Sequence, residues 1–134
     1  MIRRRRFIRL SLIGGAAISF SAIYCHTRRT EFHSVLDKPL QLSHICDTHT
    51  IRDIGLNYRL LVPAESGPDK LAELLSMDSA GAPISTSANK LFVQTLINQK
   101  ITQDFEKSNT VVVKGWILSV TEARQCALFA VNNQ

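Results

Sequence analysis

Apolar residues recur every three or four positions through much of the chain, which is the spacing of one face of an amphipathic helix. The pattern predicts a helix that begins at Ser43 or Thr48 and ends at Leu61, a second over residues 68–77 and a third over residues 87–105. The apolar stripes are Ile51, Ile54, Tyr58 and Leu61, then Leu71, Leu74 and Leu75, then Val93, Leu96, Ile97, Ile101 and Phe105.

Gly55 lies inside the first of these helices. Glycine in a helix costs about 1 kcal/mol relative to alanine, but it permits the close approach of another helix. Pro63 ends this first helix, and Pro68 suits the first turn of the next, where its missing amide hydrogen does no harm.

The pattern changes after residue 109. Residues 110–113 are Thr followed by three Val, which favour an extended strand. Lys114 and Gly115 suit a turn, and residues 116–118 continue apolar. This segment predicts a small β-hairpin.

A last helix is predicted over residues 120–131. Ser119 and Glu122 have the spacing of a capping box, in which each side chain satisfies the other residue's free amide. The predicted helix has a face of small residues suited to tight packing, made by Ala123, Cys126, Ala127 and Ala130.

These elements predict a mainly α fold: a compact bundle of about four helices with a small β-hairpin before the last helix, preceded by an N-terminal signal helix. Residues 40–134 form a single helical domain in this interpretation. Residues 25–39, which are largely polar and end at Pro39, are expected to be a flexible tether with little regular structure beyond a short turn around Phe32 to Leu36. Residues 1–24 are expected to be an export signal.

The head of the chain resembles the twin-arginine export signal, which combines an arginine pair, a phenylalanine, an aliphatic residue and a further basic residue. The residues that carry this resemblance are Arg4, Arg5, Phe7, Ile8 and Arg9. It implies recognition by the twin-arginine translocation machinery. An ordinary secretory signal is the alternative interpretation.

The uncharged run from Leu10 to Tyr24 would span roughly 22 Å as a helix, less than the 30 Å or so of a hydrocarbon core. Three outcomes stay open: cleavage before Ala22, lipidation at Cys25, or retention as an anchor that contacts the membrane. The expected location is the periplasm or thylakoid lumen, with or without membrane attachment.

The net charge of +5 belongs entirely to this head, because residues 1–24 hold five arginines and no acid. The remaining residues hold eleven basic and eleven acidic side chains. A neutral domain lacks the basic face that nucleic-acid binding requires, so we expect no nucleic-acid partner.

Candidate chemistry is sparse, and the sequence indicates no catalytic residue and no cofactor. His44, Cys46 and His49 are a candidate metal or haem site; the alternative is a core cysteine beside two surface histidines. Cys46 and Cys126 would form a disulfide or remain two buried thiols.

The late part of the chain, residues 110–129, resembles small bacterial proteins with twin-arginine signals, and Leu40–Ser43 fits the opening of their folded part. A weaker resemblance links it to the accessory small subunits of exported flavin-dependent sugar and alcohol dehydrogenases (gluconate 2-dehydrogenase subunit 3-like). That resemblance implies partner binding through Trp116, Thr121 and Glu122, whereas Trp116 is otherwise expected to pack into the core.

The leading functional hypothesis is therefore a non-enzymatic exported protein that serves as small subunit or escort of a larger exported oxidoreductase. One alternative is a small metal- or haem-binding redox protein. The other is a structural domain tethered to a membrane by the head.

Overall fold

The computed structural model describes residues 32–134 of the chain, so the predicted signal, including Arg4 and Arg5, lies outside the described residues. Residues 32–36 are helical. The elements that follow are α2 (Leu40–Ser43), α3 (Thr48–Leu61), the short 3-10 helix η1 (Pro63–Glu65), α4 (Pro68–Leu75), α5 (Lys90–Glu106), β1 (Thr110–Val113), β2 (Trp116–Ser119) and α6 (Val120–Asn132). The prediction of a mainly helical fold with a two-stranded hairpin before the last helix is confirmed.

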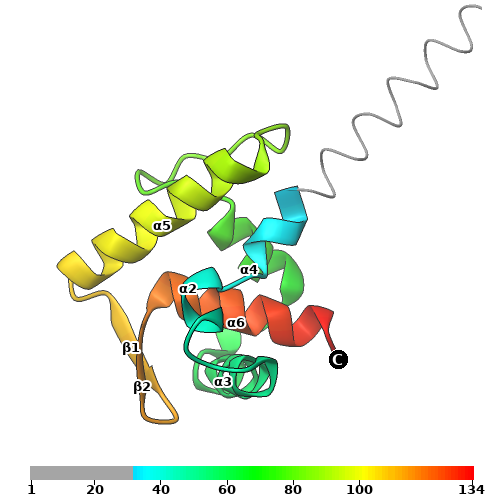
Figure 1. The fold of residues 1–134 in the computed structure, drawn as a ribbon, viewed down its shortest axis with the longest axis vertical. Coiled ribbons are helices and arrows are strands. Elements are labelled where there is room, and N and C mark those ends of the chain that lie inside the picture. The colour runs from blue at the N-terminus through cyan, green and yellow to red at the C-terminus, as the bar shows by residue number, and fades with distance from the viewer. Residues whose placement is uncertain (1–31) are drawn as a thin grey trace, which may run out of the picture.

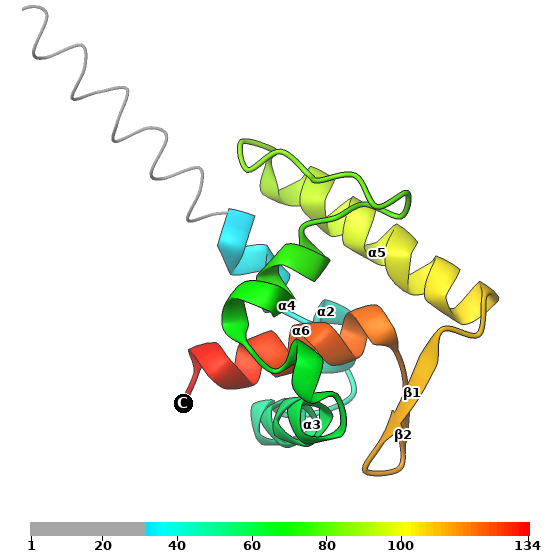
Figure 2. The same ribbon diagram turned by 180° about the vertical axis from the view of Figure 1, so that it is seen from behind.

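Helix α6 is the centre of the domain. It runs between α3 on one side and α5 on the other, with α4 packed against it as well (Figures 1 and 2). Most of its residues are buried: Thr121, Glu122, Ala123, Gln125, Cys126, Ala127, Leu128 and Ala130. The small-residue face predicted for this helix therefore lies inside the core.

The crossing of α3 and α6 depends on Gly55. A Cβ atom at this position would overlap the backbone carbonyl of Cys126 and lie 2.9 Å from the amide nitrogen of Ala127. The backbones of α3 and α6 are therefore in close contact at Gly55. The close approach expected from this glycine is confirmed.

The hairpin pairs Thr110 with Ser119 and Val113 with Trp116 in antiparallel register. Its two-residue turn places Lys114 at φ 50° and Gly115 at φ 84°. Two successive positive φ values are the geometry of the turn that matches the twist of a hairpin. The predicted hairpin and turn are correct.

The predicted helix starts are correct for α6 and need a correction for α5. Ser119 and Glu122 form the expected capping box. However, α5 begins at Lys90 and not at Ser87, because the Asn89 side chain accepts from the Phe92 amide and supplies the N-cap. For α3, Asp47 is the cap, since its carboxylate accepts from Thr50.

The predicted tether over residues 25–39 is wrong from residue 32 onward. Phe32, Val35 and Leu36 are 1%, 1% and 0% exposed. Apolar residues at positions i, i+3 and i+4 give this helical turn a face that packs into the core. The Lys38 carbonyl also accepts from Gln125 on α6. The folded domain thus begins before Leu40 and includes this turn, although the polar residues around it favour a tether.

The buried part of the apolar stripe predicted for α5 is shorter than expected. Val93, Ile97 and Ile101 are buried, but Phe105 at the end of the stripe is 46% exposed and the adjacent Phe92 is 52% exposed. The last turn of α5 extends past the core and leads into the hairpin.

Candidate functional site

Two of the three residues predicted to bind a partner are buried. Thr121 and Glu122 are 1% and 5% exposed. The Thr121 backbone amide and hydroxyl both donate to Asp104 Oδ2, at 2.9 and 2.6 Å. Glu122 Oε2 accepts from the Ser119 amide at 2.9 Å. These side chains stabilise the start of α6, and their burial gives no support to the hypothesis that they contact a partner.

Trp116, the third, is half-buried and packs against the core cluster. It pairs with the buried Val113 across the hairpin. Most of the Trp116 side chain is therefore buried, as expected for a residue that packs into the core.

The other face of the hairpin is apolar and exposed. Val112 and Ile117 are direct cross-strand partners, and they are 61% and 69% exposed. Opposed side chains on one face of an antiparallel pair contact each other, so these two form a continuous apolar surface. We call this pair the hairpin outer face.

The turn of the hairpin is fixed against α3. Lys114 Nζ lies 3.0 Å from Asp53 Oδ2. Further along α3, Leu56 and Leu60 are 38% and 78% exposed. They follow Asp53 at i+3 and i+7 and so share its side of the helix. Sequence periodicity did not single out any of these exposed apolar positions, because none of them lies on a predicted apolar stripe.

The histidines and cysteine proposed as a metal site do not come together as one. His44 and His49 are exposed, and Cys46 is half-buried with its thiol 3.2 Å from the Leu42 carbonyl oxygen. Within residues 32–134 no group of three or more His, Cys, Asp or Glu side chains has an arrangement that could hold a metal ion. The geometry thus gives no support to this alternative.

Cys46 and Cys126 are free thiols in the structure. Burial, followed by the charge of Glu122, raises the pKa of the Cys126 thiol. Burial and the charge of Asp47 raise the pKa of Cys46. Both are therefore protonated and poorly nucleophilic at neutral pH.

We expect these thiols to differ in accessibility. With Cys25 replaced by serine, a thiol reagent should label Cys46 slowly and Cys126 hardly at all in the native protein. Both should label fully after denaturation without reductant, as followed by mass spectrometry. Labelling of neither cysteine until a reductant is added would instead establish the disulfide.

A charged network joins α3, η1 and α6. The Arg124 guanidinium donates to both oxygens of Glu65, from Nε at 2.9 Å and from Nη2 at 2.8 Å. The Tyr58 hydroxyl donates to Glu65 Oε2 at 2.6 Å. The hydrogen bonds from Arg124 lower the pKa of Glu65. Burial, together with the hydrogen bond to Glu65, raises the pKa of Tyr58. Sequence reasoning missed this site because its partners are up to 59 residues apart.

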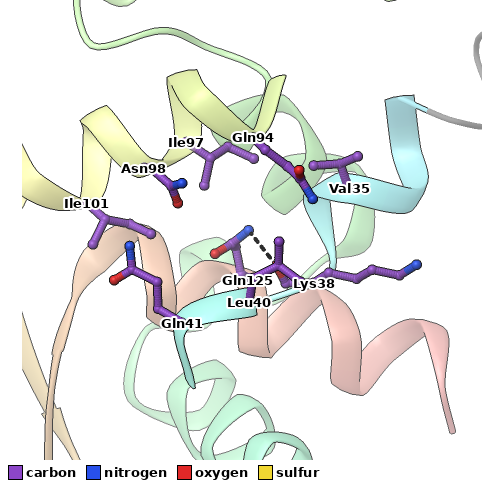
Figure 3. Close-up of a pocket in the computed structure, with 9 residues that line it drawn as sticks. All are labelled: Val35, Lys38, Leu40, Gln41, Gln94, Ile97, Asn98, Ile101 and Gln125. Carbon is purple, nitrogen blue, oxygen red and sulfur yellow. Dashed lines mark hydrogen bonds between the residues drawn. The ribbon is translucent and has the colours of Figure 1, made fainter. Parts of the chain in front are cut away.

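A small amide-lined cleft lies between residues 35–41, α5 and α6. Figure 3 shows the side chains of Gln41, Asn98 and Gln125 converging on it. Gln125 is 2% exposed and donates to the Lys38 carbonyl at 3.2 Å. The cleft encloses about 10 Å³, which is room for about one water molecule. It is a packing feature and not a ligand pocket.

A larger polar cavity of about 200 Å³ lies where the C-terminal half of α5 faces the turn at residues 78–79. Lys100, Lys107, Asp78 and Asp104 contribute its charged groups. Lys100 Nζ donates to the Leu74 carbonyl oxygen at 3.0 Å. The cavity thus has a partly buried amine in its wall.

Comparison with known protein families, curated proteins and solved structures finds no match to this chain. In the part of the chain that the structure describes, no helix combines the length and apolar character needed to cross a membrane. Function must therefore be inferred from the head of the sequence and from the surfaces described above.

Proposed function

We propose that this protein is an exported, non-enzymatic accessory protein: a small subunit or escort of a larger exported oxidoreductase. The observation that carries the proposal is the twin-arginine pattern formed by Arg4, Arg5, Phe7, Ile8 and Arg9. The weaker resemblance to accessory small subunits of exported dehydrogenases points to the same role.

The hairpin outer face is the docking surface in this proposal. Val112 and Ile117 remain 61% and 69% exposed although they are large and adjacent. Apolar side chains that lie together on a surface favour protein contacts, whereas single exposed ones are ordinary. The buried Val113 anchors the hairpin in the core, so this surface is largely preformed, which lowers the entropic cost of binding.

Export is tested by replacing the arginine pair. The double variant Arg4→Lys, Arg5→Lys keeps the positive charge of the head but removes the guanidinium pair, and we expect it to remain in the cytoplasm. Cell fractionation and immunoblotting measure the distribution. A control variant, Arg28→Lys, Arg29→Lys, lies outside the motif and should be exported normally. Unchanged export of the first variant would contradict the twin-arginine interpretation.

Docking is tested by making the hairpin outer face polar. We expect Val112→Ser, Ile117→Ser to lose most of the larger subunit on affinity purification from native membranes, because the apolar contact area disappears. Circular dichroism should show an unchanged fold, since both side chains point away from the core.

The matched control for docking is Leu91→Ser, Phe92→Ser at the start of α5, where the two side chains are 74% and 52% exposed. It removes comparable apolar surface elsewhere and should retain the partner. Equal loss in both variants would contradict a specific role for the hairpin, and equal retention would place the docking surface elsewhere.

A further inference from the structure

Lys100 differs from the other five lysines of the chain in its surroundings. Its amine is held at 3.0 Å from the carbonyl oxygen of Leu74, near the end of α4. Carbonyls in the last turn of a helix lack partners within the helix, so Lys100 satisfies one of them. At the same time, Lys100 lines the 200 Å³ cavity. One amine is therefore both fixed by the fold and adjacent to space that a small molecule can enter.

We propose that the Lys100 amine is a nucleophile that forms an imine with a small carbonyl compound bearing an anionic group, bound in this cavity. The inference goes beyond the accessory function proposed above and does not depend on it. A carbonyl compound suits the site because a lysine amine in such a setting reacts by addition to electrophilic carbon. The anionic group suits it because Lys107, whose amine has no hydrogen-bond partner among the described residues, also lines the cavity, whereas the carboxylate of Asp104 there is already bound by Thr121 and that of Asp78 by two backbone amides.

The electrostatic surroundings of Lys100 favour the reactive, neutral form of the amine. Burial, together with the charge of Arg124 on α6, lowers the pKa of Lys100 to about 8, against an opposing effect of Asp104 on α5 and Asp78 in the turn. An exposed lysine amine has a pKa of about 10.4. At neutral pH the neutral fraction of Lys100 is therefore much larger than that of an exposed lysine.

The reaction conserves atoms and charge in two steps. The amine lone pair adds to the carbonyl carbon, the carbonyl π electrons move to oxygen, and a proton passes from nitrogen to oxygen to give a carbinolamine. The C–O bond then breaks with uptake of a second proton, which releases water and leaves a protonated imine. Solvent supplies and accepts these protons, since the cavity is open to it; Asp78, which also lines the cavity, uses its Oδ1 to accept from the amides of Ala80 and Ala82.

The experiment uses glyoxylate, a small aldehyde with a carboxylate, and a cyanoborohydride that delivers hydride to the imine and traps it as a stable secondary amine. The full-length chain is treated at pH 7, and peptide mapping gives the rate at each lysine. We expect Lys100 to be labelled several-fold faster than the exposed Lys70 and Lys114. This preference should shrink above about pH 10, where exposed lysines also lose their protons.

Two comparisons separate reactivity from a purely structural role. A lysine that merely caps α4 would be shielded, so labelling of Lys100 at or below the rate of Lys70 would overturn the proposal. The variant Lys107→Gln should slow labelling of Lys100 by glyoxylate but not by acetaldehyde, which carries no charge. An equal effect on both aldehydes, or none on either, would overturn the assignment of an anionic ligand.

Discussion

Gly55→Ala is expected to destabilise the domain by about 3 kcal/mol, although alanine is the better helix former by about 1 kcal/mol. The added methyl group would overlap the backbone carbonyl of Cys126. A rigid backbone atom cannot turn aside as a side chain can, so α3 and α6 must separate and their shared core must loosen. Urea unfolding followed by circular dichroism measures the loss.

Gly67→Ser is the matched control for this effect. A Cβ atom at Gly67 meets nothing within 4 Å. This position is the N-cap of α4, where serine is a favoured residue, so stability should stay unchanged or rise slightly. If Gly55→Ala were as stable as the wild type, the close crossing of the two helices would be wrong.

Arg124→Met is expected to cost about 1–3 kcal/mol, because it leaves the Glu65 carboxylate without its bidentate partner in a partly buried site. The Arg124 and Glu65 side chains are only 21% and 19% exposed. Arg124→Lys should recover part of the loss, since it restores the charge but not the paired geometry. Thermal and urea unfolding of the three proteins give the comparison.

The exposed pair Lys70–Glu73, with side chains 49% and 55% exposed, is the control for this loss. Lys70→Met should change stability by less than about 0.5 kcal/mol, because solvent screens such a pair. Equal effects of Lys70→Met and Arg124→Met would contradict a structural role for the network around Glu65.

The same network predicts a dependence of stability on pH. The pKa of Glu65 lies below its ordinary value of 4.5 in the folded state, so the folded state binds this proton more weakly than the unfolded state. The stabilisation is present above about pH 4.5 and is lost as the pH falls through the lower, folded-state value. Stability of the wild type should therefore fall more steeply in acid than that of Arg124→Met.

The elements of this fold that local rules govern could be predicted from the sequence. The capping box at Ser119, the turn at Lys114 and Gly115, and the helix break at Pro63 each depend on residues within one turn of each other. The close contact at Gly55 could be predicted as well, because a glycine is costly inside a helix unless it lets another helix approach.

The remaining features depend on contacts between distant parts of the chain. The turn at Phe32–Leu36 is short and lies among polar residues, and only its packing in the core makes it part of the domain. Arg124 and Glu65 are 59 positions apart, and nothing local connects them. The resemblance implied partner binding through Thr121 and Glu122, but a resemblance in sequence carries no information on burial, and both side chains lie inside the domain.

The central claim, that the protein acts as a subunit of a larger exported partner, is tested most directly by the size of the native particle. Extracts of the exported fraction should be separated by size-exclusion chromatography without overexpression, and the protein identified by mass spectrometry. We expect the protein to elute with a larger oxidoreductase subunit in a constant ratio, and Val112→Ser, Ile117→Ser to shift it to the position of the 15.0 kDa chain or its processed form. Elution of the wild-type protein as a lone monomer would contradict its role as a subunit.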